Sequence, residues 1–512
     1  RTIAGAGFHL PSVICFSKVE MSPDFILSTY SSLPLLPQSL VKHEGIEYGM
    51  LRDRAGFRLA ILADNTALPL DAFSGETSPS TNHTLIIGQL TPHNTAALRA
   101  RLPWLQPQVL GLQTSAGMGD RLGLATPGHV RAVRACGDQI APIFAQQSIR
   151  EMARTVRTPQ QVMDDATWGV FQENWQGGFG ADADHLKTTD DIDTCLAAGY
   201  TFFTIDPGEH VNNKAQDARP SELREMLAKL PAALQMNVNG LLNREIKIEH
   251  LKIHLDDLTL SKAMAKYGLA VWHVAALFNH LNEAAKGKLW ELEVSVDETA
   301  QPTSHAEHVY IASELQRLGV RWVSLAPRFI GDFEKGVDYI GDVAAFEQDI
   351  AGHAAIARHF GPYKLSLHSG SDKFSIYPAA MRQTQGLVHL KTAGTSYLEA
   401  LRTIAALDED LFREIYTFAR DRYEQDRRSY HVSAQLSRAP RLKEITNWTA
   451  LLDQFDAREI LHVTFGSVLR EATLDGTKRF YDRFMTVLRE HPEVYARNLE
   501  NHFVKHLTPF NQ

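Results

Sequence analysis

The sequence has few cysteines, no excess of basic residues and no long hydrophobic run. Its three cysteines, Cys15, Cys136 and Cys195, are spread over 512 residues. We therefore expect neither a disulfide framework nor a cysteine-ligated zinc ion, and a reducing compartment such as the cytoplasm fits best. The formal net charge of -8 provides no basic surface for nucleic acid. No apolar run approaches the roughly 20 residues that span a bilayer, so we expect neither nucleic acid nor a membrane as a partner.

The composition is that of a globular protein, with 44% hydrophobic and 22% charged residues. The sequence contains no low-complexity tract and no repeat of solenoid period. Its length suits one large domain with additions. The pattern predicts an extension at 1–20 before Met21, a small N-terminal α/β subdomain at 21–105, a catalytic domain at 106–410 and a helical C-terminal extension at 411–512.

Strand-like runs alternate with helical patterns from about residue 109 to 410. We predict a strand at 109–112, a long loop at 114–129, and helices at 143–157 and 250–281. Further strands are predicted within the runs 171–186, 201–211, 289–298, 322–329, 363–368 and 386–391. Roughly six to eight strand-then-helix units indicate a parallel sheet. Polar loops after the strands favour a TIM-type (β/α)8 barrel over an open doubly wound sheet.

Two of these strand-like runs, 363–368 and 386–391, end in ionisable residues and then enter loops rich in Gly, Ser and Thr. Because strand side chains alternate between faces, His368 and His389 can each point inward at the end of its strand. About 20 residues separate them, which is roughly one βα repeat. Neighbouring barrel strands would therefore bring both imidazoles into one pocket.

An acidic face on the run 289–298 is the second signal. Glu291, Glu293, Ser295 and Asp297 share one face of this strand. Burying such a face is costly unless it lines a polar or metal-bearing cavity. An exposed edge strand is the alternative interpretation.

Ionisable residues gather at the predicted strand ends, namely Asp184, His185, Glu293, Asp297, Arg328, His368, Asp372, Lys373, His389 and Lys391. Histidines and a carboxylate on separate strands suit a divalent cation of the zinc, nickel, manganese or cobalt kind. The remaining carboxylates can move protons, and Lys and Arg can hold an acidic or polyhydroxylated substrate. Arg121, in the loop 114–129, either binds a substrate anion or forms a structural ion pair.

Several long blocks point to one family: GMGDRLGLATPGH, GADADHLKT, ELEVSVDET, LAPRF, KLSLHSGSDKFSIYP and HLKTAGTS. From about residue 110 to 400 the chain resembles the tagaturonate/fructuronate epimerase family, the metal-dependent ketose 4-epimerases. The resemblance implies a metal-dependent barrel enzyme that interconverts D-tagaturonate and D-fructuronate in hexuronate catabolism. Some members act on the neutral ketohexoses tagatose and fructose. Retro-aldol chemistry is the expected route, because the inverted carbon 4 is β to the ketone.

These observations give an assignment by residue. His185, His368 and His389 are predicted metal ligands, and Asp184 and Glu293 the catalytic acid and base in either order. The predicted substrate-binding residues are Arg121, Arg328, Lys373, Lys391 and Asp297. A regular strand would point the adjacent Asp184 and His185 apart. Both can face the pocket only where the backbone bends; otherwise Glu293 becomes the third ligand.

Other functions remain compatible with the sequence. A different metal-dependent ketose epimerase, a sugar isomerase or a class II aldolase could use the same barrel. A non-catalytic sugar-acid binding protein is the alternative outside the enzymes. In every case the expected partner is a small-molecule sugar or sugar acid.

Overall fold

The computed structural model describes residues 25–54, 56–65, 70–137, 139–235, 238–392 and 394–511. The predicted extension at 1–20 lies outside them. Within the described residues, none of the helices has the length and apolarity to cross a membrane. The chain divides into two compact units, Arg1–Leu90 and Thr91–Gln512. The division precedes residue 105 because the helix α2 (Pro92–Arg101) packs with the second unit, where Arg99 pairs with Asp164 at 2.9 Å.

The first unit is an antiparallel sheet of five strands in the order β1-β2-β3-β5-β4. The strands are β1 (Leu35–His43), β2 (Ile46–Asp53), β3 (Gly56–Asp64), β4 (Glu76–Pro79) and β5 (His83–Gly88), and one short helix, α1 (Leu27–Tyr30), precedes them. Leu27, Leu51 and Leu62 are among the residues that form its core. In its described residues this unit is therefore rich in strands.

The second unit contains the predicted (β/α)8 barrel. Eight parallel strands close in the order β12-β13-β14-β15-β6-β7-β8-β9. They are β6 (Ser115–Met118), β7 (Ala141–Ser148), β8 (Gly180–Leu186), β9 (Phe202–Ile205), β12 (Glu291–Val296), β13 (Ser324–Pro327), β14 (Lys364–Leu367) and β15 (Val388–Thr392). The last strand pairs with the first, so the sheet has no open edge.

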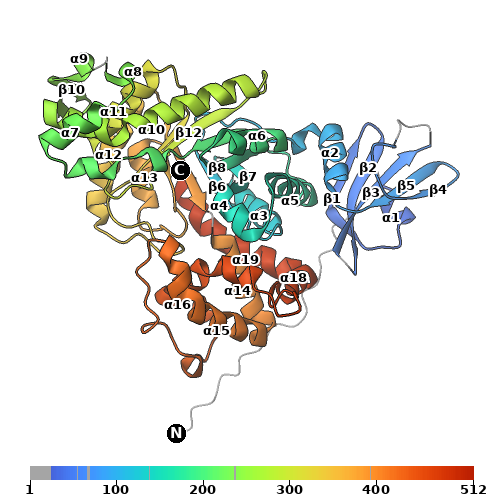
Figure 1. Ribbon diagram of the computed structural model, residues 1–512. Coiled ribbons are helices and arrows are strands. Elements are labelled where there is room, and N and C mark those ends of the chain that lie inside the picture. Colours follow the sequence, from blue (N-terminus) through green and yellow to red (C-terminus); the bar gives the residue numbers. More distant parts are fainter. Residues whose placement is uncertain are drawn as a thin grey trace, which may run out of the picture. The chain divides into compact units, whose positions relative to one another are not determined.

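Helices surround the barrel, and Figure 1 shows α3, α5 and α6 outside the strands β6, β7 and β8. The helices that follow barrel strands are α3 (Thr126–Cys136), α4 (Ile149–Thr155), α5 (Pro159–Gln172), α6 (Thr189–Ala198), α10 (Asp257–Ala284), α11 (His305–Arg317), α12 (Val343–Phe360), α13 (Tyr377–Thr384) and α14 (Thr395–Leu407). Between β9 and α10 the chain forms α7 (Pro220–Leu227), α8 (Ala232–Gln235), α9 (Val238–Leu241) and the hairpin of β10 (Arg244–Ile248) and β11 (Leu251–Leu255).

Three sequence predictions about secondary structure are wrong. The strand expected at 109–112 is irregular, and its backbone N–H groups at Leu110 and Gly111 bind the Glu291 carboxylate at 2.9 and 2.7 Å. The helix expected at 143–157 begins as the strand β7, which is buried along its whole length. A strand that is covered on both faces loses the alternation that identifies strands. The helix expected from residue 250 begins only at Asp257, after β11.

The C-terminal region is helical, as predicted, and it packs on the loops at the carboxyl ends of the barrel strands. Its helices are α15 (Glu409–Asp426), α16 (Phe455–Val463), α17 (Phe465–Arg470), α18 (Tyr481–Glu490) and α19 (Pro492–Leu507). Helix α16 reaches the loop after β14 through the pair Arg458–Asp372 at 3.1 Å. Helix α19 packs on α3 and α14. The C-terminal region therefore holds the barrel loops of its own chain in place.

Candidate active site

A cluster of charged side chains lies at the carboxyl ends of the barrel strands. Its members come from β8, β9, β12, β14 and β15 and the residues that follow them: Asp182, Asp184, His185, Asp206, Glu293, Asp297, His368 and Lys391. All are largely buried except for the side chain of Asp297, which is 20% exposed. The sequence predicted six of these residues; it did not assign Asp182 or Asp206.

The backbone bends at His185. A regular strand would point the adjacent side chains of Asp184 and His185 to opposite faces, and the bend lets both face the pocket. His185 has a φ of 54°, in the left-handed region, and the pairing of β8 with β9 shifts register between Ala183 and Leu186. Non-glycine residues adopt this conformation rarely, and it is found at functional sites. As a result, His185 Nε2 lies 3.8 Å from Asp184 Oδ1, and both side chains face the same point.

Two carboxylates enclose His368 directly after β14. Its Nε2 lies 2.7 Å from Glu293 Oε1, and its Nδ1 lies 3.3 Å from Asp297 Oδ1. Burial by itself lowers the pKa of His368, but the charges of Asp297 and Glu293 outweigh burial and raise it to about 10. The ring of His185 stands edge-on to it at 5.1 Å between centroids. The pKa of His185 is likewise raised, to about 9, because Asp184 and Asp206 outweigh burial.

Lys391 lies beneath the histidines and joins three carboxylates. Its Nζ is 2.9 Å from Asp182, 2.7 Å from Asp184 and 2.8 Å from Glu293. These charges raise the pKa of Lys391 against the effect of burial. Burial raises the pKa of Asp182 to about 7, and Lys391 opposes that rise. The predicted substrate-binding lysine is therefore engaged in holding the three carboxylates together.

This donor set fits a divalent transition-metal ion. Ligand atoms of Asp184, His185 and His368 all lie within 4.8 Å of one another. Two imidazoles with a carboxylate suit zinc and its neighbours. Each imidazole is also held by a second carboxylate through Nδ1, His185 by Asp206 at 3.2 Å and His368 by Asp297 at 3.3 Å. Such outer carboxylates orient histidine ligands in metal proteins.

His389, the third predicted ligand, is not brought to this group. It lies two residues before Lys391 on β15, one layer deeper in the barrel, where its Nδ1 bonds Ser115 Oγ at 2.9 Å and its ring packs on Phe202. Lys364 completes that layer through Ser115 at 2.9 Å. Burial lowers the pKa of His389 to about 3. Parity placed the side chain inside the barrel, but it did not give its depth.

Two predicted substrate-binding cations are engaged elsewhere. Arg121 is buried in an ion pair with Glu151 and stacks on Phe465 at 3.7 Å, which is the structural alternative that the sequence left open. Lys373 is buried and donates to the carbonyls of Glu334, Val337 and Ser371 at 2.7, 2.5 and 3.1 Å. Lys373 therefore fixes the loop that follows β13.

A cavity of about 640 Å³ opens above the charged cluster and is the space where a substrate could lie. Asp297, Arg328 and His368 line it; the sequence analysis assigned the first two to substrate binding and His368 to the metal ion. Arg150 and Lys335 also line it, and the sequence analysis missed both. They lie on α4 and on the loop after β13, where no strand parity reveals which side chains face the barrel axis.

Comparisons with known proteins identify the family of this chain. The family model for tagaturonate epimerase matches residues 36–510. The chain belongs to the tagaturonate epimerase family. A curated relative, the tagaturonate/fructuronate epimerase of Thermotoga maritima, is 44% identical over 419 residues, which cover 81% of this chain and 84% of that protein.

Solved structures of the family have the same fold. A glycerol-complexed crystal structure of the fructuronate-tagaturonate epimerase UxaE from Cohnella laeviribosi is 37% identical, with a TM-score of 0.89. The match covers 94% of this chain and 97% of that one. The native structure of the same protein matches with a TM-score of 0.88. The barrel, the N-terminal sheet and the C-terminal helices are therefore features of the tagaturonate epimerase family.

Proposed function

We propose that this protein is an epimerase that interconverts D-tagaturonate and D-fructuronate at carbon 4 with the aid of a divalent metal ion. The observation that supports it is the cluster of two histidines and several carboxylates beneath a cavity lined by cations. The family match and the relatives named for this reaction support the substrate. A small sugar acid fits a cavity of about 640 Å³.

His185 and His368 are the proposed ligands of the ion, and Asp184 reaches the same point. An ion bound there would polarise the ketone and the adjacent hydroxyl group and would stabilise negative charge that develops on them. The second-layer carboxylates, Asp206 and Asp297, hold the two imidazoles in the orientation that directs Nε2 inward. We place the predicted His389 outside this set.

Asp184 and Glu293 are the proposed proton carriers. Carbon 4 is β to the ketone at carbon 2, so its hydrogen is not acidified and direct deprotonation is slow. In the proposed route one carboxylate accepts the proton of the 4-hydroxyl group, and the bond between carbons 3 and 4 breaks. The aldehyde half turns its other face, the bond re-forms, and a carboxylic acid returns the proton to oxygen 4. Lys391 contacts both carboxylates and keeps them ionised at the start.

The substrate carboxylate needs a cationic anchor, which we assign to Lys335, Arg328 and Arg150 at the cavity wall. Arg328 is held by the carbonyl of Thr299, and Arg150 pairs with Glu298 at 2.9 Å. Arg328 was already part of the sequence-based assignment, and Lys335 and Arg150 take the place of Arg121, Lys373 and Lys391. The neutral ketohexoses tagatose and fructose lack the carboxylate, so we propose that they are poorer substrates.

The first experiment incubates metal-reconstituted protein with D-tagaturonate and, separately, with D-tagatose, before and after chelation, and identifies the products by NMR. We expect metal-dependent formation of D-fructuronate. Run in deuterium oxide, the retro-aldol route leaves carbon 4 unlabelled, whereas a proton transfer at carbon would label it. Failure to convert either sugar with metal bound would reject the proposed reaction.

Metal content of matched variants tests the residue roles. His368→Ala should lose the ion and activity together, because it removes a ligand. Glu293→Gln should keep the ion and lose turnover, because Glu293 is outside the group of proposed ligand atoms. The control is His389→Gln, in the deeper layer, which should keep the ion. If His368→Ala still binds the active-site metal ion while His389→Gln loses it, the ligand assignment is wrong.

A further inference from the structure

A second group of possible metal ligands lies outside the active site, between the helices α11 and α12. It consists of His305 at the start of α11 and Asp349 and His353, one turn apart on α12. Asp349 Oδ1 is 3.6 Å from His305 Nε2 and 3.7 Å from His353 Nε2. Ligand bonds of 2.0–2.1 Å in a tetrahedral zinc site space the donor atoms about 3.4 Å apart. The three donors are therefore close to the spacing that an ion requires. His305 Nε2 also donates to the Asp349 carbonyl oxygen at 3.0 Å, and a bound ion would replace this hydrogen bond.

The surroundings of His353 leave its Nε2 directed at this point. His353 is fully buried, and its Nδ1 bonds His308 Nδ1 at 2.8 Å, while His308 Nε2 bonds Tyr363 Oη at 2.7 Å. When His353 donates through Nδ1, the lone pair of Nε2 faces Asp349. Among the described residues Nε2 has no hydrogen-bond partner of good geometry, although the Thr303 backbone also approaches the ring. A histidine ligand typically donates its other N–H in this way.

A glycine in the middle of α12 makes room for the other imidazole. A Cβ atom at Gly352 would lie 2.2 Å from Cε1 and 2.3 Å from Nε2 of His305. Glycine in a helix interior costs about 1 kcal/mol relative to alanine. At this position the cost is offset because any larger residue would push the His305 ring away from α12. Ser304 fixes His305 from the other side, because it caps α11 in a reciprocal pair of hydrogen bonds with Glu307 at 2.7 and 3.2 Å.

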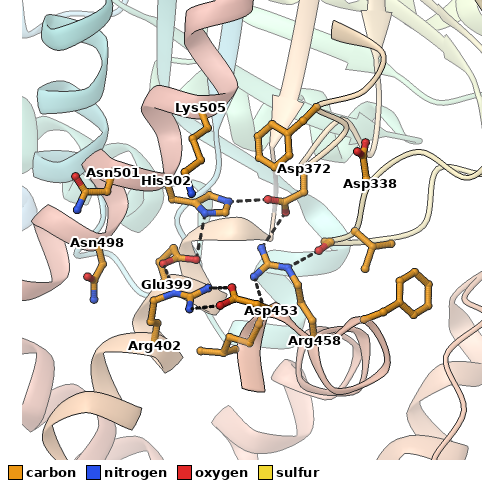
Figure 2. A pocket seen from close by; sticks show the side chains of 15 residues that line it. Asp338, Asp372, Glu399, Arg402, Asp453, Arg458, Asn498, Asn501, His502 and Lys505 are labelled. Carbon is orange, nitrogen blue, oxygen red and sulfur yellow. Dashed lines mark hydrogen bonds and ion pairs between the residues drawn. The ribbon is translucent and has the colours of Figure 1, made fainter. Parts of the chain in front are cut away.

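The third histidine–carboxylate group of the described residues is different. Asp372, in the loop after β14, is contacted by His502 and Arg458 of the C-terminal region (Figure 2). His506 Nε2 lies 3.7 Å from the same carboxylate. There the Asp372 backbone N–H donates to His506 Nε2 at 2.9 Å, and the carboxylate contacts Arg458 at 3.1 Å and His502 at 2.6 Å. The ligand atom of His506 is thus in use, and this group is an ion-pair network that joins α16 and α19 to the barrel.

We propose that His305, Asp349 and His353 bind a divalent transition-metal ion of the zinc class, distinct from any ion in the active site. The side chains of His305 and Asp349 are 29% and 15% exposed, so water can complete the coordination. The ion joins α11 to α12 next to the wall of the catalytic cavity. Asp349 Oδ2 accepts from the Ile330 N–H at 3.3 Å, and Thr303 exchanges hydrogen bonds with Arg328 at 2.8 and 3.1 Å. It is a structural site that braces the loop carrying Arg328.

Metal stoichiometry tests the proposal in the full-length protein. After loading with Zn²⁺ and gel filtration, we expect two ions per chain in the wild type and one in His305→Ala and Asp349→Asn. His368→Ala should also bind one ion, and the double variant His305→Ala/His368→Ala none. Equal zinc content in the wild type and in His305→Ala would overturn the proposal. The metal content of His368→Ala tests only the active-site ion, and that of His305→Ala tests only the second site. The proposed function and this proposal can therefore fail separately.

Thermal unfolding gives a readout that is independent of activity. In the His368→Ala background, which lacks the active-site ion, added Zn²⁺ should raise Tm by several degrees, because an ion that binds only the folded state stabilises it. Gly352→Ala in the same background keeps all three ligands but displaces the His305 ring, and it should abolish that rise. An unchanged Tm of His368→Ala on addition of Zn²⁺ would overturn the proposal.

Discussion

At the scale of single residues, side-chain depth and backbone bends decide which predictions from sequence hold. The strand-end pattern identified Asp184, His185, Glu293, Asp297, His368 and Lys391, and the structure brings these six together. The same pattern selected His389, which lies a layer too deep. Alternation tells which way a side chain points, but where along the barrel axis it lies depends on strand stagger, which the sequence does not encode locally.

The cations show a second reason why sequence reasoning is incomplete. Arg121 and Lys373 lie in loops that follow barrel strands, which is where a substrate-binding cation is expected. Both are instead bound to partners within the protein. Lys335, which lines the cavity, lies on a loop without periodicity. The partners of a long charged side chain are set by tertiary contacts, so its type and position in a sequence do not reveal its role.

Replacing Lys335 separates substrate binding from scaffold support. We expect Lys335→Met to lower kcat/KM for D-tagaturonate by about 10- to 100-fold, mainly through KM, because a hydrogen bond to a charged group contributes about 1.5–3 kcal/mol. The paired control is Lys373→Met, which removes three carbonyl contacts and should lower Tm. Steady-state kinetics and thermal denaturation measure both. Unaltered kinetics in Lys335→Met would contradict its role as the anchor.

At the scale of elements, close helix packing fixes the C-terminal region on the barrel. Helix α19 lies against α3 at Gly128, where a Cβ atom would be 2.5 Å from Leu499 Cβ and 2.8 Å from the Ala496 carbonyl oxygen. Helix α17 contains Gly466, where a Cβ atom would meet Arg154 Cβ at 3.4 Å, an ordinary contact. The same substitution should therefore have opposite effects at the two glycines.

We expect Gly128→Ala to destabilise the protein by about 1–3 kcal/mol through overpacking. Gly466→Ala should stabilise it by up to about 1 kcal/mol, since alanine is the better helix former. Chemical denaturation of the two variants beside the wild type measures both changes. A stabilised Gly128→Ala variant would show that α19 does not pack this closely on α3.

Element types follow from the sequence where the pattern is periodic and capped. Helix α6 begins with a capping box of Thr188 and Asp191, a spacing that marks a helix start in a sequence. The prediction for strand β7 was wrong because burial on both faces removes the alternation of polar and apolar residues. Strand β6, Ser-Ala-Gly-Met, has few of the residues that favour strands, and the barrel closes around it through its neighbours.

At the scale of the whole molecule, stability should depend on pH through a buried pair of carboxyl groups. Glu459 on α16 is fully buried and faces Glu334. Burial raises the pKa of Glu459 from 4.5 to about 9, and the charge of Glu334 adds to this rise. Because the folded protein retains a proton that the unfolded chain releases, this contribution is fully present below pH 4.5 and is lost as pH rises to about 9.

Glu459→Gln removes this linked proton and preserves a hydrogen-bond donor to Glu334. We expect the variant to lose less stability than the wild type between about pH 6 and about pH 9, and to be the more stable of the two at the upper end. Tm measured across that range in buffers of equal ionic strength tests the expectation. Parallel pH profiles for the two proteins would mean that Glu459 does not hold its proton.

The closure of the barrel has a consequence for how the protein is made. Strand β15 is the last of the eight to be synthesised; it carries Lys391 and pairs with β6, the first. While translation proceeds, Asp182, Asp184 and Glu293 emerge from the ribosome long before the ammonium group that neutralises them. Their mutual repulsion opposes premature collapse of a partial barrel, whose open edges would invite aggregation. Nascent chains that stop short of residue 391 should therefore depend on chaperones, and the finished barrel forms late in synthesis.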